Sequence, residues 1–166
     1  MISEKIQSAI NEQINQELFS AYIYYSMAAH AASRGFNGFA SWLHVQAQEE
    51  LTHANKLYGF IIDRGGVVKL ESLAAPQSQW DSMLAVFEHA AQHEKGISAR
   101  INRLVELARG EKDTAAEVFL HWFVNEQVEE EKNADDLVLR IRMVGPSVGS
   151  LLYLDKEAGK RKAGGE

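Results

Sequence analysis

The sequence predicts an all-α protein: a four-helix bundle with a long crossover between the second and third helices and a short fifth helix at the C-terminus. Long segments carry apolar residues at helical spacing, and the only prolines, Pro76 and Pro146, lie outside them. Gly35, Gly65-Gly66 and Gly110 interrupt the pattern where helices would end. Helices of roughly 30 residues would each be about 45 Å long, so an elongated bundle is expected rather than a globin-like packing.

Helix-capping residues set the expected boundaries of the first two helices. The first is expected from about Ser3 to Arg34, and the second from Asn37, as a capping residue, to about Arg64. Residues 67–77 then form a connection longer than an ordinary bundle turn. This length predicts a crossover that runs back along the domain.

Similar signals place the remaining helices. Ser78 is a candidate cap for the third helix, with Asp81 in its first turn, and Asp113 is a candidate cap for the fourth. The fourth helix is expected to stop at Gly145-Pro146, and residues 147–158 to form the short fifth helix. Residues 1–158 are thus predicted to be one domain, and residues 159–166 a flexible tail whose Lys160-Arg161-Lys162 run is a solvated end.

Composition excludes several classes of protein. The chain has 166 residues, 46% of them hydrophobic and 24% charged, which suits one globular domain with a sizeable core. A net charge of -6 argues against nucleic-acid and anionic-membrane partners, because these need clustered cations. No apolar run long enough to span a bilayer and no signal peptide occur, so a cytoplasmic location is expected. Without cysteine, any transition metal must be held by His and carboxylate groups, which suit iron and manganese.

Each predicted apolar stripe is interrupted by one glutamate. A buried, unpaired carboxylate is costly, so one in every helix is not expected by chance. Four converging carboxylates require cations, and two divalent ions would neutralise them. The stripes are Ile10, Ile14, Glu17, Ala21, Tyr24 and Ala28; Leu43, Ala47, Glu50, Ala54, Leu57 and Ile61; Phe87, Ala90, Glu94, Ile97 and Ile101; and Phe123, Gln127, Glu130, Ala134 and Leu137.

Glu50-x-x-His53 has the spacing of a metal-binding pair, because residues three apart on a helix are neighbours and dinuclear bundle sites use this motif. Alone, the pair is explained equally well by chance or by a solvated face. The spacing of the acids adds an independent signal. Glu17 and Glu50 lie 33 residues apart, as do Glu94 and Gln127, and His53 lies 77 residues before Glu130. The chain therefore resembles two equivalent helical hairpins.

This layout predicts an asymmetric dinuclear metal site. One ion is expected at Glu17, Glu50 and His53, and a more weakly held ion at Glu50, Glu94 and Glu130, so that Glu50 bridges the two. Gln127 is expected to hydrogen-bond a bound water or oxygen species rather than to bind metal. If the helical phase is wrong, these acids lie on the surface instead.

Three motifs, Glu17-Leu-x-x-Ala-x-x-Tyr24, Gln48-Glu49-Glu50-x-x-His53 and Asn125-Glu126-Gln127-x-Glu129-Glu130, together with the long connection, make residues 1–158 similar to the bacterial non-haem ferritins. The resemblance implies a ferritin-like fold and a ferroxidase centre that binds two Fe(II), reduces dioxygen or peroxide and passes Fe(III) to a mineral core. Haem is not expected, because Gln127-x-x-Glu130 replaces the second Glu-x-x-His of bacterioferritins. The absence of cysteine disfavours rubrerythrins.

The resemblance also assigns roles to further residues. It implies a third iron site at Glu49, Glu126, Glu129 and Glu130. For Glu49, Glu126 and Glu129, the alternative is a solvated charge run. Tyr24 would hydrogen-bond a ligand or donate an electron, or else pack in the core. Trp122 is a candidate electron donor, although packing explains it better. Glu117 matches a position that lines the three-fold channels of the shell, although an exposed acid near a helix N-terminus needs no such role.

The family's assembly implies partners for the chain. Shells of 24 identical subunits are expected, with the short last helix at the four-fold axes. Two other functions share part of the evidence: a different oxygen-activating di-iron oxidoreductase, and a non-catalytic helical scaffold stabilised by metal. The five other histidines are expected to be surface or packing residues: His30, His44, His89, His93 and His121.

Overall fold

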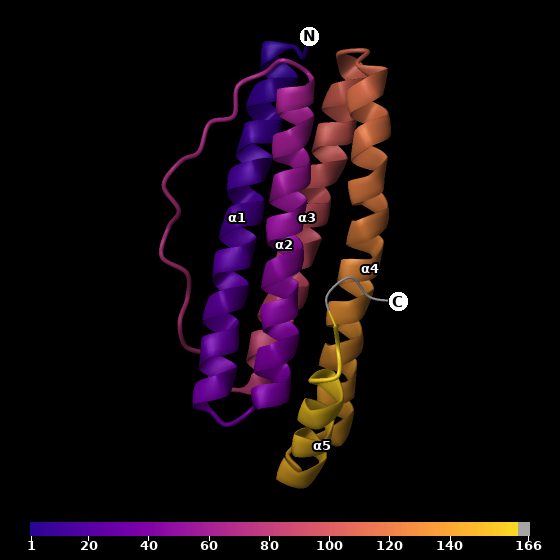
Figure 1. Ribbon diagram of the computed structural model, residues 1–166. Coiled ribbons are helices and arrows are strands. Elements are labelled where there is room, and N and C mark those ends of the chain that lie inside the picture. The colour runs from indigo at the N-terminus through magenta and orange to yellow at the C-terminus, as the bar shows by residue number, and fades with distance from the viewer. Residues whose placement is uncertain (163–166) are drawn as a thin grey trace.

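The structure is a computed structural model that describes residues 1–162, and those residues form five helices and no strand. The bounds of the helices are α1 Glu4–Ser33, α2 Asn37–Asp63, α3 Met83–Gly110, α4 Thr114–Val144 and α5 Val148–Ala158. The first two pack as one hairpin and the next two as another, which together make an elongated four-helix bundle (Figure 1). This confirms the predicted fold class. None of the helices described is long and apolar enough to cross a membrane.

The crossover between α2 and α3 runs the length of the bundle along the outer side of α1 (Figure 1). Two asparagines one turn apart on α1 hold it in place. Asn11 Oδ1 accepts a hydrogen bond from the Lys69 backbone N–H at 2.7 Å, and Asn15 Oδ1 accepts one from the Glu71 N–H at 2.8 Å. The crossover is therefore fixed to α1 by its own backbone groups, which explains how a long connection without secondary structure stays ordered.

The third helix begins later than predicted. Its cap is Ser82, whose Oγ accepts a hydrogen bond from the Ala85 N–H, while Ser78 and Asp81 lie in the crossover. Trp80 explains the difference. Its side chain is buried, so the crossover stays packed against the bundle as far as Trp80, and α3 can begin only after it. The predicted cap of α4 is confirmed, since Asp113 Oδ1 accepts from the Ala116 N–H.

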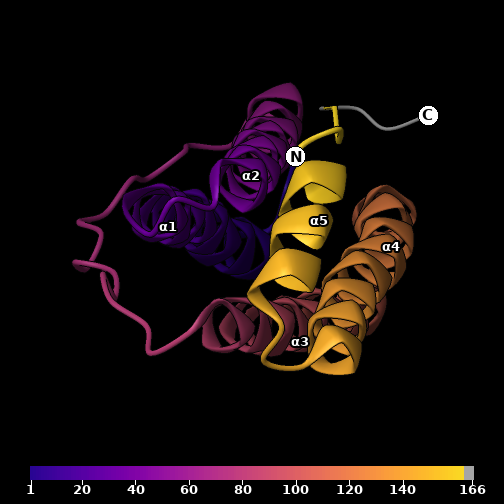
Figure 2. The ribbon, with the colours of Figure 1, turned by 90° about the horizontal axis from the view of Figure 1, so that it is seen from below.

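The start of α2 is capped by another helix. Asn37, predicted as its cap, is the first helical residue, and Phe36 at the cap position makes no side-chain hydrogen bond. Instead Asp155 Oδ1 of α5 accepts from the Phe39 N–H at 2.7 Å. A Cβ on Gly38 would lie 1.7 Å from the Asp155 carbonyl oxygen, so this close approach requires glycine. Figure 2 shows α5 lying across the end of the bundle, between α2 and α4.

The core consists of two apolar clusters separated along the bundle axis. One is built around Phe39 and Phe87, near the end that α5 covers, and the other around Ile10 and Leu57. Every predicted stripe residue is buried except Leu137, which is only partly buried because Val138 takes the inward position on α4. The interrupting polar residues fall between the two clusters.

Candidate metal centre

Four carboxylates, one from each long helix, lie in the polar layer between the apolar clusters. Glu17, Glu50 and Glu94 are each 1% exposed and Glu130 is 5% exposed. His53, one turn after Glu50, is also buried in this layer. The structure therefore brings together all five residues predicted to form the dinuclear site and rejects the alternative of surface acids.

Three of these residues converge as a group of candidate ligands. Glu17, Glu50 and His53 each offer an atom within 4.8 Å of the others, and His53 Nδ1 lies 3.5 Å from Glu50 Oε2 and 4.0 Å from Glu17 Oε2. Those two oxygens and that nitrogen are buried without a hydrogen-bond partner. Because buried polar atoms are normally paired, three unpaired ones facing each other fit a bound cation.

The second predicted ligand set is arranged differently. Glu94 belongs to neither convergent group of the described residues: Tyr24 donates its phenol hydrogen bond to Glu94 Oε1, and Gln127 Nε2 donates to Glu94 Oε2 at 3.1 Å. Glu130 converges instead with His53 and Glu126. Gln127, expected to bond a water or oxygen species, thus holds Glu94.

Burial raises the pKa of every carboxyl group in the layer. The pKa values of Glu94 and Glu130 rise to about 7, and those of Glu17 and Glu50 rise well above the usual range. Loss of hydration is the largest cause of the rise, and repulsion among the acids raises the pKa values further. Hydrogen bonds from neighbouring side chains stabilise the charged forms and offset part of the rise. A cation that entered the layer would displace protons from these groups.

Gln13 contacts the candidate ligand Glu17, and the sequence did not lead us to predict this contact. Its Nε2 donates to Glu17 Oε1 at 2.7 Å, and its Oε1 accepts from Arg100 Nε at 3.1 Å. The guanidinium can only donate, so it fixes the amide with its NH₂ group toward the carboxylate. Arg100 thereby orients a candidate ligand from outside the layer.

Gln46 makes the equivalent contact in the other half of the hairpin. Its Nε2 donates to Glu130 Oε2 at 2.6 Å and to Glu50 Oε1 at 3.3 Å, while its Oε1 accepts from Arg161 Nη1 at 2.8 Å. The sequence carries a signal for this pair: Gln13 and Gln46 lie 33 residues apart, and each precedes a candidate ligand glutamate by four residues. The offset that relates Glu17 to Glu50 could have found both glutamines.

Comparison with known proteins agrees with this geometry. A family model described as a ferritin-like domain matches residues 7–144. This chain belongs to the ferritin-like family. A bacterial non-heme ferritin from Bacteroides fragilis is 42% identical over 161 residues, covering 97% of this chain and 100% of that protein. One from Staphylococcus epidermidis is 37% identical, covering 97% of both chains.

Solved ferritin structures have the same fold. The open pore ferritin of the hyperthermophilic archaeon Archaeoglobus fulgidus superimposes with a TM-score of 0.96 at 51% sequence identity, covering 98% of this chain and 99% of that one. A humanized archaeal ferritin gives the same TM-score at 49% identity. Together with the candidate metal-binding groups, these relatives identify the chain as an iron storage ferritin.

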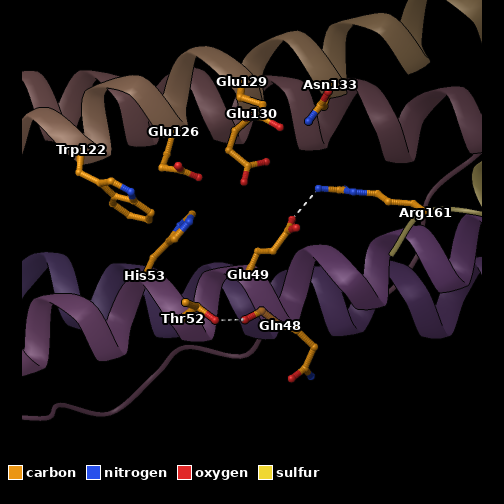
Figure 3. A pocket seen from close by; sticks show the side chains of 10 residues that line it. All are labelled: Gln48, Glu49, Thr52, His53, Trp122, Glu126, Glu129, Glu130, Asn133 and Arg161. Atoms are coloured by element: carbon orange, nitrogen blue, oxygen red, sulfur yellow. Dashed lines mark hydrogen bonds and ion pairs between the residues drawn. The ribbon is translucent and has the colours of Figure 1, made fainter. Parts of the chain in front are cut away.

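A cavity of about 350 Å³ in this ferritin opens beside the buried layer (Figure 3). His53 and Trp122 line it, together with the four acids predicted for a third iron site, which are Glu49, Glu126, Glu129 and Glu130. Glu126 is partly buried, Glu129 is exposed, and Glu49 pairs with Arg161 Nη2 at 2.5 Å. The acids thus gather around one cavity rather than along an unrelated charged face.

The remaining candidates of this ferritin have structural partners. The Trp122 ring packs edge-on against His53 at 5.6 Å, and Glu117 pairs with Arg109 at 2.9 Å. His93 Nε2 lies 2.8 Å from Ser20 Oγ, and burial lowers the pKa of His93 to about 4. The Trp122 and His93 contacts suit packing roles, and Glu117 forms a surface ion pair.

Proposed function

We propose that this ferritin is a ferroxidase that oxidises Fe(II) to Fe(III) at a dinuclear centre and deposits the product as a ferric mineral inside a protein shell. The observation that carries the proposal is the convergence of unpaired Glu17, Glu50 and His53 atoms inside a layer of four buried carboxylates. We assign one Fe(II) to those three residues and a second to Glu50, Glu94 and Glu130.

The chemistry needs a pair of metal ions. Two Fe(II) ions give up one electron each, and dioxygen takes both electrons and two protons to become hydrogen peroxide; with peroxide as oxidant, the product is water. Oxygen ligands favour the ferric state that forms. Tyr24 and Gln127 would act by holding Glu94 in place, as their hydrogen bonds to its two oxygens suggest.

A third iron position would lie in the adjoining cavity. Glu49, Glu126, Glu129 and Glu130 line it, and Glu130 also belongs to the buried layer. We propose that iron ions pass between the dinuclear centre and this position, since the two share a ligand. No haem and no nucleic-acid partner are part of the proposal.

The shell is proposed to contain 24 copies of this chain in the cytoplasm. Large apolar side chains exposed on the single subunit would be covered there. They include Tyr22, Tyr58, Val118, Val128, Leu139, Met143, Leu152 and Tyr153. Sedimentation of the purified protein measures the subunit number directly.

The decisive experiment loads metal-free protein with Fe(II) without oxygen, adds oxygen, and records the rate of Fe(III) formation. Glu50→Ala removes the proposed bridging ligand and should abolish the rapid phase. Glu106→Ala, which removes an exposed acid from α3, is the matched control and should oxidise iron at the rate of the unmodified protein. Unchanged rapid oxidation in Glu50→Ala refutes the dinuclear assignment.

The same experiment separates the other two functions. A different di-iron oxidoreductase would stop after about two irons per subunit, whereas a storage protein would continue far beyond that number. A scaffold that uses metal only for stability would show no turnover of Fe(II) and oxygen.

A further inference from the structure

The cavity beside the candidate metal centre is lined in part by a cationic side chain of the chain itself. Arg161, three residues after the end of α5, is the one Lys or Arg among the described residues that line it. Its Nη2 lies 2.5 Å from Glu49 Oε2, and its Nη1 donates to Gln46 Oε1 at 2.8 Å. The guanidinium also lies 4.4 Å over the Trp42 ring.

This contact is more specific than a solvated chain end. The Arg161 side chain is only 18% exposed, in contrast to the expectation that the Lys160-Arg161-Lys162 run is solvated. Residues 163–166 of the predicted flexible tail lie outside the described residues. A guanidinium held by a carboxylate, an amide and an aromatic face occupies a built position.

The same cavity also contains three residues that could bind a metal ion: His53, Glu126 and Glu130. His53 is 3% exposed and lines the cavity. Its ring offers an atom within 4.8 Å of carboxylate oxygens of Glu126 and Glu130. Figure 3 shows His53, Glu126 and Glu130 pointing into the space between α2 and α4, with the Glu49–Arg161 pair beside them.

We infer that Arg161 lowers the affinity of the outer cation position, the one beside Glu49, Glu126 and Glu130, for divalent ions. Arg161 holds Glu49 in an ion pair, and a divalent ion must displace the guanidinium before it can bind Glu49. The inference rests on the proposed function, because the outer position is the third iron site of that proposal. Glu49 Oε2 cannot bind a metal ion at close range while a guanidinium occupies it. A guanidinium stays charged at any working pH, so Arg161 competes throughout.

Displacement would also reach the buried layer. Arg161 fixes the orientation of the Gln46 amide, and Gln46 donates to both Glu50 and Glu130. When Arg161 leaves, Gln46 loses the donor that keeps its NH₂ group toward those carboxylates. An ion in the outer position would therefore weaken the hydrogen bonds that orient Glu50 and Glu130. In this way, iron binding in the outer position would affect iron oxidation at the dinuclear centre.

Zn(II) binding to the assembled, metal-free protein tests the inference without any oxidation. Calorimetric titration should show that Arg161→Gln binds the weakest class of Zn(II) about tenfold more tightly than the unmodified protein does, a difference of about 1.4 kcal/mol. Arg161→Lys keeps the charge but loses the paired and stacked guanidinium contacts, so its Zn(II) affinity should fall between those of the unmodified protein and Arg161→Gln. Lys160→Gln, which removes an adjacent charge that pairs with Glu157, is the control and should change nothing.

Glu49 provides a second variant. If Arg161 acts through Glu49, then Arg161→Gln should have no effect on Zn(II) affinity in a Glu49→Gln background. Unchanged or weaker Zn(II) binding in Arg161→Gln alone, or an undiminished effect in the Glu49→Gln background, overturns the inference.

Trp42 provides a readout of the displacement itself. In a Trp80→Phe, Trp122→Phe background, Zn(II) should change the Trp42 fluorescence, and Arg161→Gln in that background should abolish the change. A Zn(II) response that persists without Arg161 contradicts displacement. If the unmodified protein fails to oxidise Fe(II), the proposed function is wrong, whereas the Zn(II) measurements still decide the role of Arg161.

Discussion

The contribution of the Tyr24 hydroxyl group can be measured by a substitution that removes only that group. The side chain is fully buried and donates its hydrogen bond to Glu94. Tyr24→Phe removes that donor from a buried carboxylate and should lower the free energy of unfolding of the metal-free protein by about 1–3 kcal/mol. Tyr25→Phe is the matched control: its hydroxyl bonds Gln48 at an exposed position, so a change within about 0.5 kcal/mol is expected. Equal effects in denaturant unfolding would contradict the assigned contact.

The buried acids predict an unusual dependence of stability on pH. Glu94 and Glu130 have pKa values of about 7 in the folded protein, above the usual 4.5, so the folded state keeps protons that the unfolded chain releases. The metal-free protein should therefore lose stability as pH rises from about 4.5 to about 7. Glu94→Gln should make that loss shallower in thermal unfolding, and Glu106→Gln at the surface should not. A stability that rises over this range would contradict the burial effect.

At the same scale, the sequence predicted which acids are buried better than it predicted the side chains that hydrogen-bond to them. Glutamates on apolar stripes are conspicuous because burying them is costly, so Glu17 and Glu50 could be found from periodicity alone. Gln13 and Gln46 precede them at helical spacing but have no charge to make them conspicuous. Arg161 could not be predicted at all, since its position depends on where α5 directs the chain.

At the scale of elements, the docking of α5 on α2 depends on Gly38. A Cβ on Gly38 would meet the Asp155 carbonyl oxygen at 1.7 Å, so Gly38→Ala should displace α5 and cost about 1–3 kcal/mol. Gly59→Ala in the same helix has nothing within 4 Å of its new Cβ and should stabilise by about 0.5–1 kcal/mol. Thermal unfolding compares the two, and hydrogen exchange of residues 148–158 should rise only in Gly38→Ala. Equal stability of the two variants would remove the steric argument.

Helix boundaries were predictable where the cap is local. Asp113 caps the helix that follows it directly, as expected. The start of α2 was predicted less well because its cap, Asp155, comes from a helix more than a hundred residues later in the chain. The start of α3 was misplaced because Ser78 has the sequence of a cap, whereas packing of Trp80 extends the crossover to Ser82. Long-range contacts, rather than weak propensities, account for both errors.

At the scale of the whole molecule, the polar layer divides the apolar core into two clusters. Each hairpin contributes two of the four acids, so the layer joins α1 and α2 to α3 and α4. Without a cation, repulsion and desolvation of these acids oppose the packing of one hairpin on the other. The clusters on both sides must supply the stability that the layer lacks.

Metal binding should consequently stabilise the whole bundle. Zn(II) at about a hundred times its dissociation constant should add about 2.7 kcal/mol to the free energy of unfolding, because the ion binds the folded layer and not the unfolded chain. The thermal midpoint should rise in the unmodified protein and fall back when a chelator removes the ion. Glu50→Ala should lose most of this shift, because that variant removes the carboxylate shared by both proposed ions. Glu106→Ala should keep the shift in full, and an equal shift in both variants would mean that the stabilising ion binds outside the buried layer.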